Sequence, residues 1–439
     1  MNSIADIRIL TSNQKIMERR IFLKNAATIS AFSILKPGIV FGSKENSAIR
    51  VGVIGCGNRA TAVISSLSAN TNSNIIGIAD IFEDKLRTAT PAFNKMNAAK
   101  EFPSLKGSNI YQGSKAYLRL LDNKDIDAVL ISSPAYSHVE FLEAAVAAGK
   151  HVYCEKPVAT DVDGCKRVMQ VGEKLNGKQS VVIGFQIRYS SPYVEMVNRI
   201  HRGDIGEMIT VQLYYLSSGT PIIPLTNTSY DEIRIRNHYY FRAMSGDIIL
   251  DQGIHMLDVC NWALKAHPLN AVGKGNITGR PDFGDTFSNF QVLYQYPNNV
   301  NVSIHTTKVG PQFGDVCCRF MGTKGIAEAH YSGGVFINGV NKWDSGIAKS
   351  GSELTPQQQA SGVFLSSLYD ADANKEKAFI TSIETGKYLN ETRSGSESTL
   401  TAILGRNSAT TQREMTWDEI YFSNERLDPK LNLSQFDKS

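Results

Sequence analysis

The chain has 439 residues, more than a single hydrophobic core of roughly 250 to 300 residues supports, so two domains are expected. Hydrophobic residues make up 42% of it and charged residues 20%, which excludes a disordered or fibrous chain. The net charge of +4 comes from the start of the chain, because residues 1–50 carry eight Lys and Arg against three Asp and Glu, leaving 38 basic and 39 acidic residues beyond. A nearly neutral body without a basic surface argues against a nucleic-acid partner.

The beginning of the chain is typical of an export leader. Arg19 and Arg20 open the stretch R-R-I-F-L-K, a twin-arginine signal, and an apolar, small-residue stretch follows over residues 25–35. That stretch is about a dozen residues long, whereas a permanent membrane helix needs roughly 20, so no stable membrane span is expected. We interpret residues 1–47 as an N-terminal extension and leader that sends the protein to the periplasm. The alternative is an ordinary basic helix.

The cysteines are scattered without paired spacing, which predicts small buried side chains rather than a disulfide framework. They are Cys56, Cys154, Cys165, Cys260, Cys317 and Cys318.

The first regular pattern after the leader is a strand, a glycine turn and a helix. Residues 49–54 are apolar, Gly55-x-Gly57-x-x-Ala60 follows, and residues 61–69 have a helical pattern. Gly55 permits a tight turn, Gly57 lets the backbone approach a pyrophosphate, and Ala60 allows close packing of helix on strand. This pattern predicts a dinucleotide-binding βαβ unit.

The residues around this turn refine the prediction. Asn58 and Arg59 begin the helix, whose free amides would face the phosphates. A second apolar strand, residues 75–79, ends at Asp80, where a carboxylate can bind the adenine ribose and repel a 2′-phosphate. NAD is therefore favoured over NADP, although Asp80 could also be an ordinary strand-end cap.

Further strands and helices alternate up to about residue 175. The pattern indicates helices over residues 114–122 and 138–149 and strands over residues 127–132 and 151–154. Such alternation is typical of a doubly wound parallel sheet, so residues 48–175 are predicted to form a Rossmann domain.

Two loops follow the strands of this predicted domain. The first contains Ser133, Pro134 and His138, and the second contains Glu155 and Lys156. Because ligands bind at the carboxyl ends of parallel strands, these five residues are expected to contact the cofactor.

Four motifs together resemble the glucose-fructose oxidoreductase / inositol dehydrogenase / MocA (Gfo/Idh/MocA) family: G-C-G-N-R-A, S-S-P-x-x-x-H, C-E-K-P and G-D-I-I-L-D-Q-G-I-H-M-L-D. The resemblance implies an α/β Rossmann domain followed, over residues 176–439, by an α+β domain with a large, mostly antiparallel open sheet. It also implies a homo-oligomer, a dimer or tetramer, and a catalytic trio of Lys156, Asp251 and His255.

The chemistry of these three side chains suits oxidation of an alcohol. His255 can accept a proton near neutrality, and Asp251 lies one helical turn away, where it would orient the ring or bind a substrate hydroxyl. Lys156 would donate to the reacting oxygen. The alternatives are that Lys156 only pairs with Glu155 and that His255 is a core histidine. Asp251, His255 and Asp258 have the spacing i, i+4, i+7, which could also place metal ligands on one helix face. No second His or Cys cluster supports a metal site, so we expect a structural role for Asp258 and no metal.

Two segments of the second domain are expected to contact a polyhydroxylated substrate. Gln186, Arg188 and Tyr189 offer donors and a ring, although Arg188 could be a solvent-facing charge. Residues 219–242, which include Tyr240, form either a substrate-side loop or a surface or subunit-contact loop.

The rest of the second domain shows strands and helices. Alternating residues predict strands over residues 289–296 and 300–306, and helical patterns cover residues 379–385 and 398–413.

The leading hypothesis is an NAD-dependent oxidoreductase that takes hydride from a secondary hydroxyl of a sugar, glycoside or polyol. Twin-arginine export carries folded proteins, so NAD would travel with the protein and be held tightly. One alternative is an NAD-dependent glycoside hydrolase that oxidises the sugar transiently. Another is a non-catalytic sugar- or nucleotide-binding protein.

Overall fold

The structure is a computed structural model that describes residues 47–309, 314–347 and 367–437. The predicted twin-arginine stretch lies outside the described residues. No helix in the described part of the chain is both long and apolar enough to cross a membrane.

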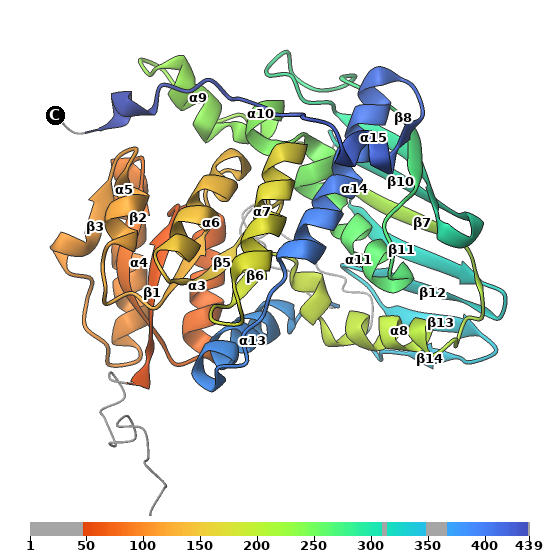
Figure 1. Ribbon diagram of the computed structural model, residues 1–439, viewed down its shortest axis with the longest axis horizontal. Coiled ribbons are helices and arrows are strands. Elements are labelled where there is room, and N and C mark those ends of the chain that lie inside the picture. The colour runs from red at the N-terminus through yellow and green to blue at the C-terminus, as the bar shows by residue number, and fades with distance from the viewer. Residues whose placement is uncertain (1–46, 310–313, 348–366, 438–439) are drawn as a thin grey trace, which may run out of the picture. The chain divides into compact units, whose positions relative to one another are not determined.

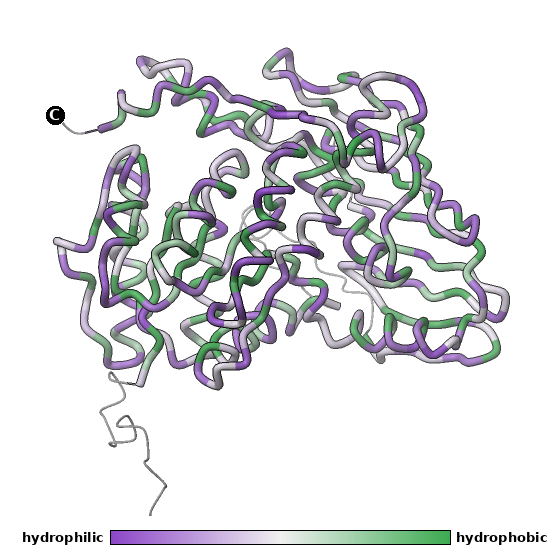
Figure 2. Tube along the Cα trace, viewed as in Figure 1, coloured by the Kyte–Doolittle hydropathy of each residue, from purple (hydrophilic) through white to green (hydrophobic). Residues whose placement is uncertain are grey.

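The first sheet has six parallel strands in the order β3-β2-β1-β4-β5-β6 (Figure 1). Their bounds are β1 Ile49–Ile54, β2 Ser73–Asp80, β3 Ile110–Gln112, β4 Ala128–Ile131, β5 His151–Cys154 and β6 Val181–Ile183. The strand order reverses between β1 and β4, which is where ligands bind to such sheets. The central strands β1 and β4 are mostly apolar (Figure 2), as expected for strands buried on both faces, whereas the edge strand β3 is half-buried.

Helices cover both faces of this sheet. One face carries α3 Asn58–Asn70, α4 Glu83–Ala98 and α13 Ala371–Thr385, and the other carries α5 Ala116–Leu121, α6 His138–Ala147 and α7 Val162–Lys174. The predicted doubly wound fold is confirmed. Helix α13 comes from late in the chain and packs against α3, so the first layer is completed by a distant segment.

The first sheet continues past residue 175, where the sequence suggested a domain boundary. Strand β6 pairs in register with β5, Val152 opposite Val181, and therefore belongs to the first sheet rather than to the second domain.

The second sheet has nine strands in the order β14-β13-β12-β11-β7-β10-β9-β8-β15. Their bounds are β7 Met208–Ser217, β8 Asn270–Asn276, β9 Asn289–Tyr296, β10 Val300–Lys308, β11 Asp315–Gly322, β12 Gly325–His330, β13 Val335–Gly339, β14 Trp343–Asp344 and β15 Met415–Thr416. Strands β7 and β10 run parallel and their neighbours run antiparallel. This confirms the predicted large, mostly antiparallel sheet.

Helices pack on one face of the second sheet and join it to the first. They include α8 Ser191–His201, α11 Ile254–Leu264, α14 Thr392–Thr411 and α15 Trp417–Tyr421. Two short helices, α9 Tyr230–Arg236 and α10 Arg242–Ser245, lie in the connection between β7 and α11. Helix α14 contacts α7 and β6 on one side and β8 and β9 on the other. All six cysteines are buried and free, as predicted.

Candidate active site

The glycine turn after β1 leaves room for a phosphate. Gly55 has φ +87°, and a Cβ there would lie 2.7 Å from the backbone nitrogen of Ser133, so only glycine lets the two loops close. At Gly57, by contrast, a Cβ would meet no described atom within 4 Å. Helix α3 then begins without a side-chain cap and without an acidic residue in its first turn. These open amides fit the pyrophosphate of a dinucleotide.

Asp80 braces this turn. Its Oδ2 accepts a hydrogen bond from the amide of Cys56 at 2.7 Å and its Oδ1 accepts one from the amide of Phe82 at 2.9 Å. Burial raises the pKa of Asp80, and the two amide bonds oppose that rise. The carboxylate thus stands at the carboxyl end of β2, where the ribose of a dinucleotide is expected.

Arg59 contacts other side chains of the predicted site. Its Nε donates to Glu155 Oε1 at 2.8 Å, and its Nη2 lies 3.3 Å from both Gln186 Oε1 and Asp372 Oδ1. Burial opposes ionisation of Glu155, but the charges of Arg59, Lys375 and Lys156 together outweigh it and keep the pKa of that carboxyl below its usual value. Arg59 and Glu155, predicted for the cofactor, therefore share a network with Gln186, predicted for the substrate.

His138 ties the two predicted cofactor loops together. Its Nδ1 lies 2.7 Å from the carbonyl oxygen of Pro157 and its Nε2 lies 2.8 Å from that of Ser133. Burial lowers the pKa of His138. Because both ring nitrogens have protein partners, His138 holds the loop of Ser133 and Pro134 against the loop of Lys156.

Lys156 and Asp251 come together as the motifs suggested. The Nζ of Lys156 donates to the backbone carbonyl of Asp251 and lies 3.8 Å from its Oδ1. Burial lowers the pKa of Lys156, and Asp251 and Glu155 partly restore it.

A second lysine, Lys308 at the end of β10, completes this group. Its Nζ lies 2.7 Å from Asp251 Oδ2 and 4.0 Å from the ring centroid of Tyr239, and its side chain is 8% exposed. Burial disfavours the charged form of Asp251, but Lys308 and Lys156 lower its pKa to about 2. Sequence reasoning missed Lys308 because no motif marks the end of an alternating strand.

The D-x-x-x-H segment departs from a regular α-helix. Ile249–Gly253 forms a π-helical turn, η5, and α11 begins directly after it at Ile254. Such wide turns recur at functional sites. Here Asp251 is paired with the two lysines rather than hydrogen-bonded to His255.

His255 is buried in an aromatic environment. Its ring stacks on Tyr215 at 6.1 Å between centroids and meets Phe185 edge-on at 6.3 Å. Burial, with Lys156 and Arg59, holds the pKa of His255 well below its usual value, so the ring is neutral. Within the described residues no group hydrogen-bonds its Nδ1. A buried ring nitrogen without a partner fits a hydroxyl group of a substrate.

The other predicted substrate residues have partners inside the protein. Arg188 forms a bidentate pair with the buried carboxylate of Asp258, which matches the structural role expected for Asp258. The hydroxyl of Tyr189 donates to Glu391, and that of Tyr240 donates to the carbonyl of Thr220.

Residues 219–242, expected as a loop, contain α9 and the short helix η4, His238–Tyr240. Tyr239, one residue before the predicted Tyr240, is the ring that contacts Lys308. Burial lowers the pKa of the neighbouring His238 to about 4.

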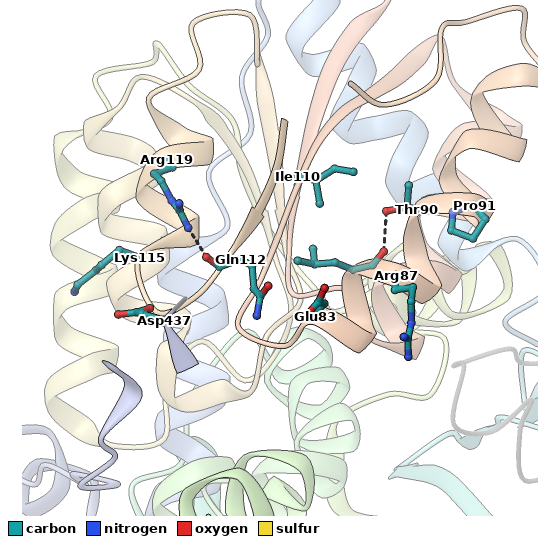
Figure 3. A pocket seen from close by; sticks show the side chains of 10 residues that line it. Glu83, Arg87, Thr90, Pro91, Ile110, Gln112, Lys115, Arg119 and Asp437 are labelled. Atoms are coloured by element: carbon teal, nitrogen blue, oxygen red, sulfur yellow. Dashed lines mark hydrogen bonds between the residues drawn. The ribbon is translucent and has the colours of Figure 1, made fainter. Parts of the chain in front are cut away.

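The C-terminal segment runs from α15 past α9 to the first domain (Figure 1). Phe436, in the short helix η7 Leu433–Phe436, meets Phe82 edge-on at 5.3 Å, and Asp437 accepts a hydrogen bond from the amide of Ser114 at 2.6 Å. Asp437 also lines a cavity of about 820 Å³ between α4, β3 and α5, together with Glu83, Leu86, Arg87, Thr90, Pro91, Ile110, Gln112, Lys115 and Arg119 (Figure 3). None of the predicted site residues lines this cavity.

Comparison with known proteins shows which family the chain belongs to. Residues 49–183 match a model described as an oxidoreductase family with an NAD-binding Rossmann fold, and residues 193–328 match the GFO/IDH/MocA C-terminal domain. Both domains of an NAD-binding oxidoreductase family are therefore present. The chain belongs to the Gfo/Idh/MocA family, which confirms the resemblance seen in its motifs and the expected cofactor, NAD.

Curated relatives include inositol dehydrogenases. Inositol 2-dehydrogenase 3 of Saccharopolyspora erythraea is 30% identical over 217 residues, 49% of this chain and 54% of that protein. Inositol 2-dehydrogenase of Salmonella typhimurium is 27% identical over 285 residues, 64% of this chain and 73% of that protein. The chain therefore spans about half of the first relative and about three quarters of the second.

Solved structures share the fold. A scyllo-inositol dehydrogenase from Lactobacillus casei with bound NAD(H) and scyllo-inositol matches with a TM-score of 0.64 at 19% identity, over 84% of this chain and 99% of that chain. An aldose-aldose oxidoreductase from Caulobacter crescentus complexed with glycerol matches with a TM-score of 0.64 at 18% identity, over the same shares.

Proposed function

We propose that the protein oxidises a secondary hydroxyl of a sugar, glycoside or polyol and passes the hydride to tightly bound NAD. The observation that carries this proposal is the buried, neutral His255, whose Nδ1 has no partner among the described residues. The inositol dehydrogenases among its relatives support a polyhydroxylated ring as substrate.

The residues that would hold NAD line the carboxyl ends of the first sheet. The open amides at Gly57 and the start of α3 would bind the pyrophosphate, and Asp80 would bind the adenine ribose. NAD supplies the hydride acceptor when it is bound.

His255, Lys156 and Asp251 each have a different role in the proposed reaction. The imidazole of His255 takes the proton of the substrate hydroxyl, because a neutral imidazole is the free base at the site. The ammonium of Lys156 donates a hydrogen bond to the reacting oxygen and stabilises the negative charge that develops on it. Asp251 stays a carboxylate and fixes the positions of Lys156 and Lys308.

Product analysis tests this proposal. Purified protein, with its NAD content measured first, is incubated with myo-inositol, free hexoses and aryl glycosides, and the products are identified by mass spectrometry. A keto product two mass units lighter, with reduced NAD, supports oxidation. Free aglycone without net oxidation would show a glycoside hydrolase instead, and unchanged substrate that nevertheless binds would show a binding protein.

We further propose export to the periplasm by the twin-arginine route. Arg19 and Arg20 and the short apolar stretch after them support this proposal. A reporter fused after residue 47 should reach the periplasm, and the double change Arg19→Lys and Arg20→Lys should keep it in the cytoplasm. Export of both fusions alike would contradict the proposal.

We also propose a homo-oligomer built on the second sheet. Val272 and Leu293 face each other across β8 and β9, and each is 46% exposed. An exposed apolar pair on a broad sheet favours burial against a second copy. Light scattering after gel filtration should give a dimer or tetramer, and the change Leu293→Glu should lower that mass.

A further inference from the structure

Three side chains of the types that can bind metal ions lie together on strands β11 and β12. Cys317 and His330 are direct partners across the antiparallel pair, and Asp315 precedes Cys317 by two residues, so all three side chains share one face of the sheet. Cys318 points to the other face, into the main hydrophobic core.

The ligand atoms of this trio are close together. One carboxylate oxygen of Asp315, the Sγ of Cys317 and one ring nitrogen of His330 all lie within 4.8 Å of one another. Zinc binds such atoms at about 2.0 to 2.3 Å, so small movements of the side chains would bring all three onto one ion. Cys317 is fully buried, whereas His330 is 28% exposed, which leaves a path for an ion and a water ligand.

A further carboxylate holds the histidine ring. Nε2 of His330 lies 2.5 Å from Glu328 Oε1, and the other oxygen of Glu328 lies 3.1 Å from Nε of Arg319. Histidines that bind metals commonly give their second ring nitrogen to a carboxylate, which fixes the tautomer and aims the first nitrogen at the ion. Here Glu328 contacts Nε2, so Nδ1 is the nitrogen that would bind the ion.

We propose that Asp315, Cys317 and His330 form a binding site for a divalent cation of the zinc type. Sulfur, nitrogen and carboxylate oxygen together suit zinc and cobalt better than magnesium or calcium. Binding releases the proton of the Cys317 thiol to solvent, and a water molecule takes the fourth position. None of these residues belongs to the catalytic group, so the site stands apart from the proposed reaction, and a bound ion would link β11 to β12.

Cobalt titration tests this site, because a bound thiolate gives a charge-transfer absorption in the near ultraviolet. The native protein, freed of metal with a chelator, should develop this band at one equivalent of Co²⁺ and lose it when Zn²⁺ is added. Cys317→Ser should abolish the band, and His330→Gln should weaken cobalt binding at least tenfold. Cys318→Ser is the matched control, since this neighbouring thiol faces the core, and it should keep the band.

Two outcomes would overturn the proposal. One is the absence of a thiolate band in the native protein, and the other is an equal band in Cys317→Ser. If Cys317→Ser does not fold, the melting temperature of the native protein tests the proposal instead. Zn²⁺ should raise this temperature and a chelator should reverse the rise, and no change would overturn the proposal. NAD content, measured in every sample, shows that the first domain remains intact.

Discussion

The ammonium of Lys308 lies 2.7 Å from Oδ2 of Asp251, so the end of strand β10 is bound to the π-helical turn that carries the catalytic motif. Lys156 approaches the other oxygen of the same carboxylate at 3.8 Å. One carboxylate thus orders two lysines from different segments.

Replacing Lys308 tests this arrangement. Lys308→Met should lower kcat by about tenfold, a cost of about 1.4 kcal/mol, because Asp251 then swings toward Lys156 and withdraws it from the reacting oxygen. The pKa of Asp251, about 2 in the native protein, should rise. A lowered carboxyl pKa stabilises the folded state at pH values above the pKa of the unfolded state, about 3.9, and this stabilisation is lost as the pH falls through about 2. Because the variant has less of this stabilisation, it should unfold at a higher pH than the native protein when acid is added. The pH profiles of kcat and of unfolding measure both effects, and Lys308→Arg should restore most of the native behaviour.

Removing Lys156 separates chemistry from cofactor binding. Lys156→Ala should abolish turnover, because no donor then stabilises the reacting oxygen, while the glycine turn keeps NAD. Steady-state rates and the NAD content after gel filtration measure the two effects. Lys174→Ala, on the exposed surface of α7, is the control. Full activity in Lys156→Ala would refute the catalytic role of this lysine.

Local patterns in the sequence predicted the elements that depend on near neighbours. Strands β1, β5 and β9 have the predicted bounds, since alternation or a continuous apolar run identifies them within a few residues. Helix α4 was not anticipated, because Pro91 lies inside it and only packing on the first sheet overrides that signal.

Contacts between distant segments decided the rest. The type of a residue shows which donors it offers but not which partner uses them. The sequence could not show whether Arg188 binds substrate or a protein group, because its partner, the buried Asp258, lies 70 positions away. Arg59 meets Asp372, 313 positions away, for the same reason. Lys308 lies at the end of β10, and the pairing of β10 with β7 helps to place it beside Asp251.

The preference for NAD should depend on Asp80. Asp80→Asn removes the negative charge that repels a 2′-phosphate, while the amide oxygen can still accept one of the two backbone hydrogen bonds. The ratio of NADPH to NADH affinity should rise about tenfold or more, equal to about 1.4 kcal/mol. Fluorescence titrations with both cofactors measure it. Asp84→Asn, one turn along on α4, should leave the ratio unchanged, and an unchanged ratio in Asp80→Asn would contradict the assignment.

Glu376 should destabilise the protein at alkaline pH. It is fully buried, and burial, with Asp372 beside it, raises its pKa to about 8. A raised carboxyl pKa favours folding below the unfolded value of about 4.3, and that advantage is lost as the pH rises through about 8. Glu376→Gln should therefore be more stable than the native protein at pH 8, by up to roughly 5 kcal/mol at about 1.4 kcal/mol per pKa unit, and gain little at pH 4. Urea unfolding at both pH values measures the difference, with the exposed Glu384→Gln as control.

The C-terminal segment should help to retain NAD. Phe436 packs edge-on against Phe82, whose amide donates to Asp80, so the segment supports the loop expected to hold the adenine ribose. Phe436→Ala should cost about 1 kcal/mol of stability from the aromatic pair. It should also speed the loss of NAD, because the loop after β2 then moves more freely.

The control for this change lies in the same part of the chain. Phe422 is 73% exposed, so Phe422→Ala removes a ring of equal size without loosening that loop. NAD retained after repeated gel filtration and the melting temperature should fall in Phe436→Ala and not in Phe422→Ala. Equal NAD retention in both variants would show that the segment stabilises the first domain without holding its cofactor, since the melting temperature alone responds to any lost packing.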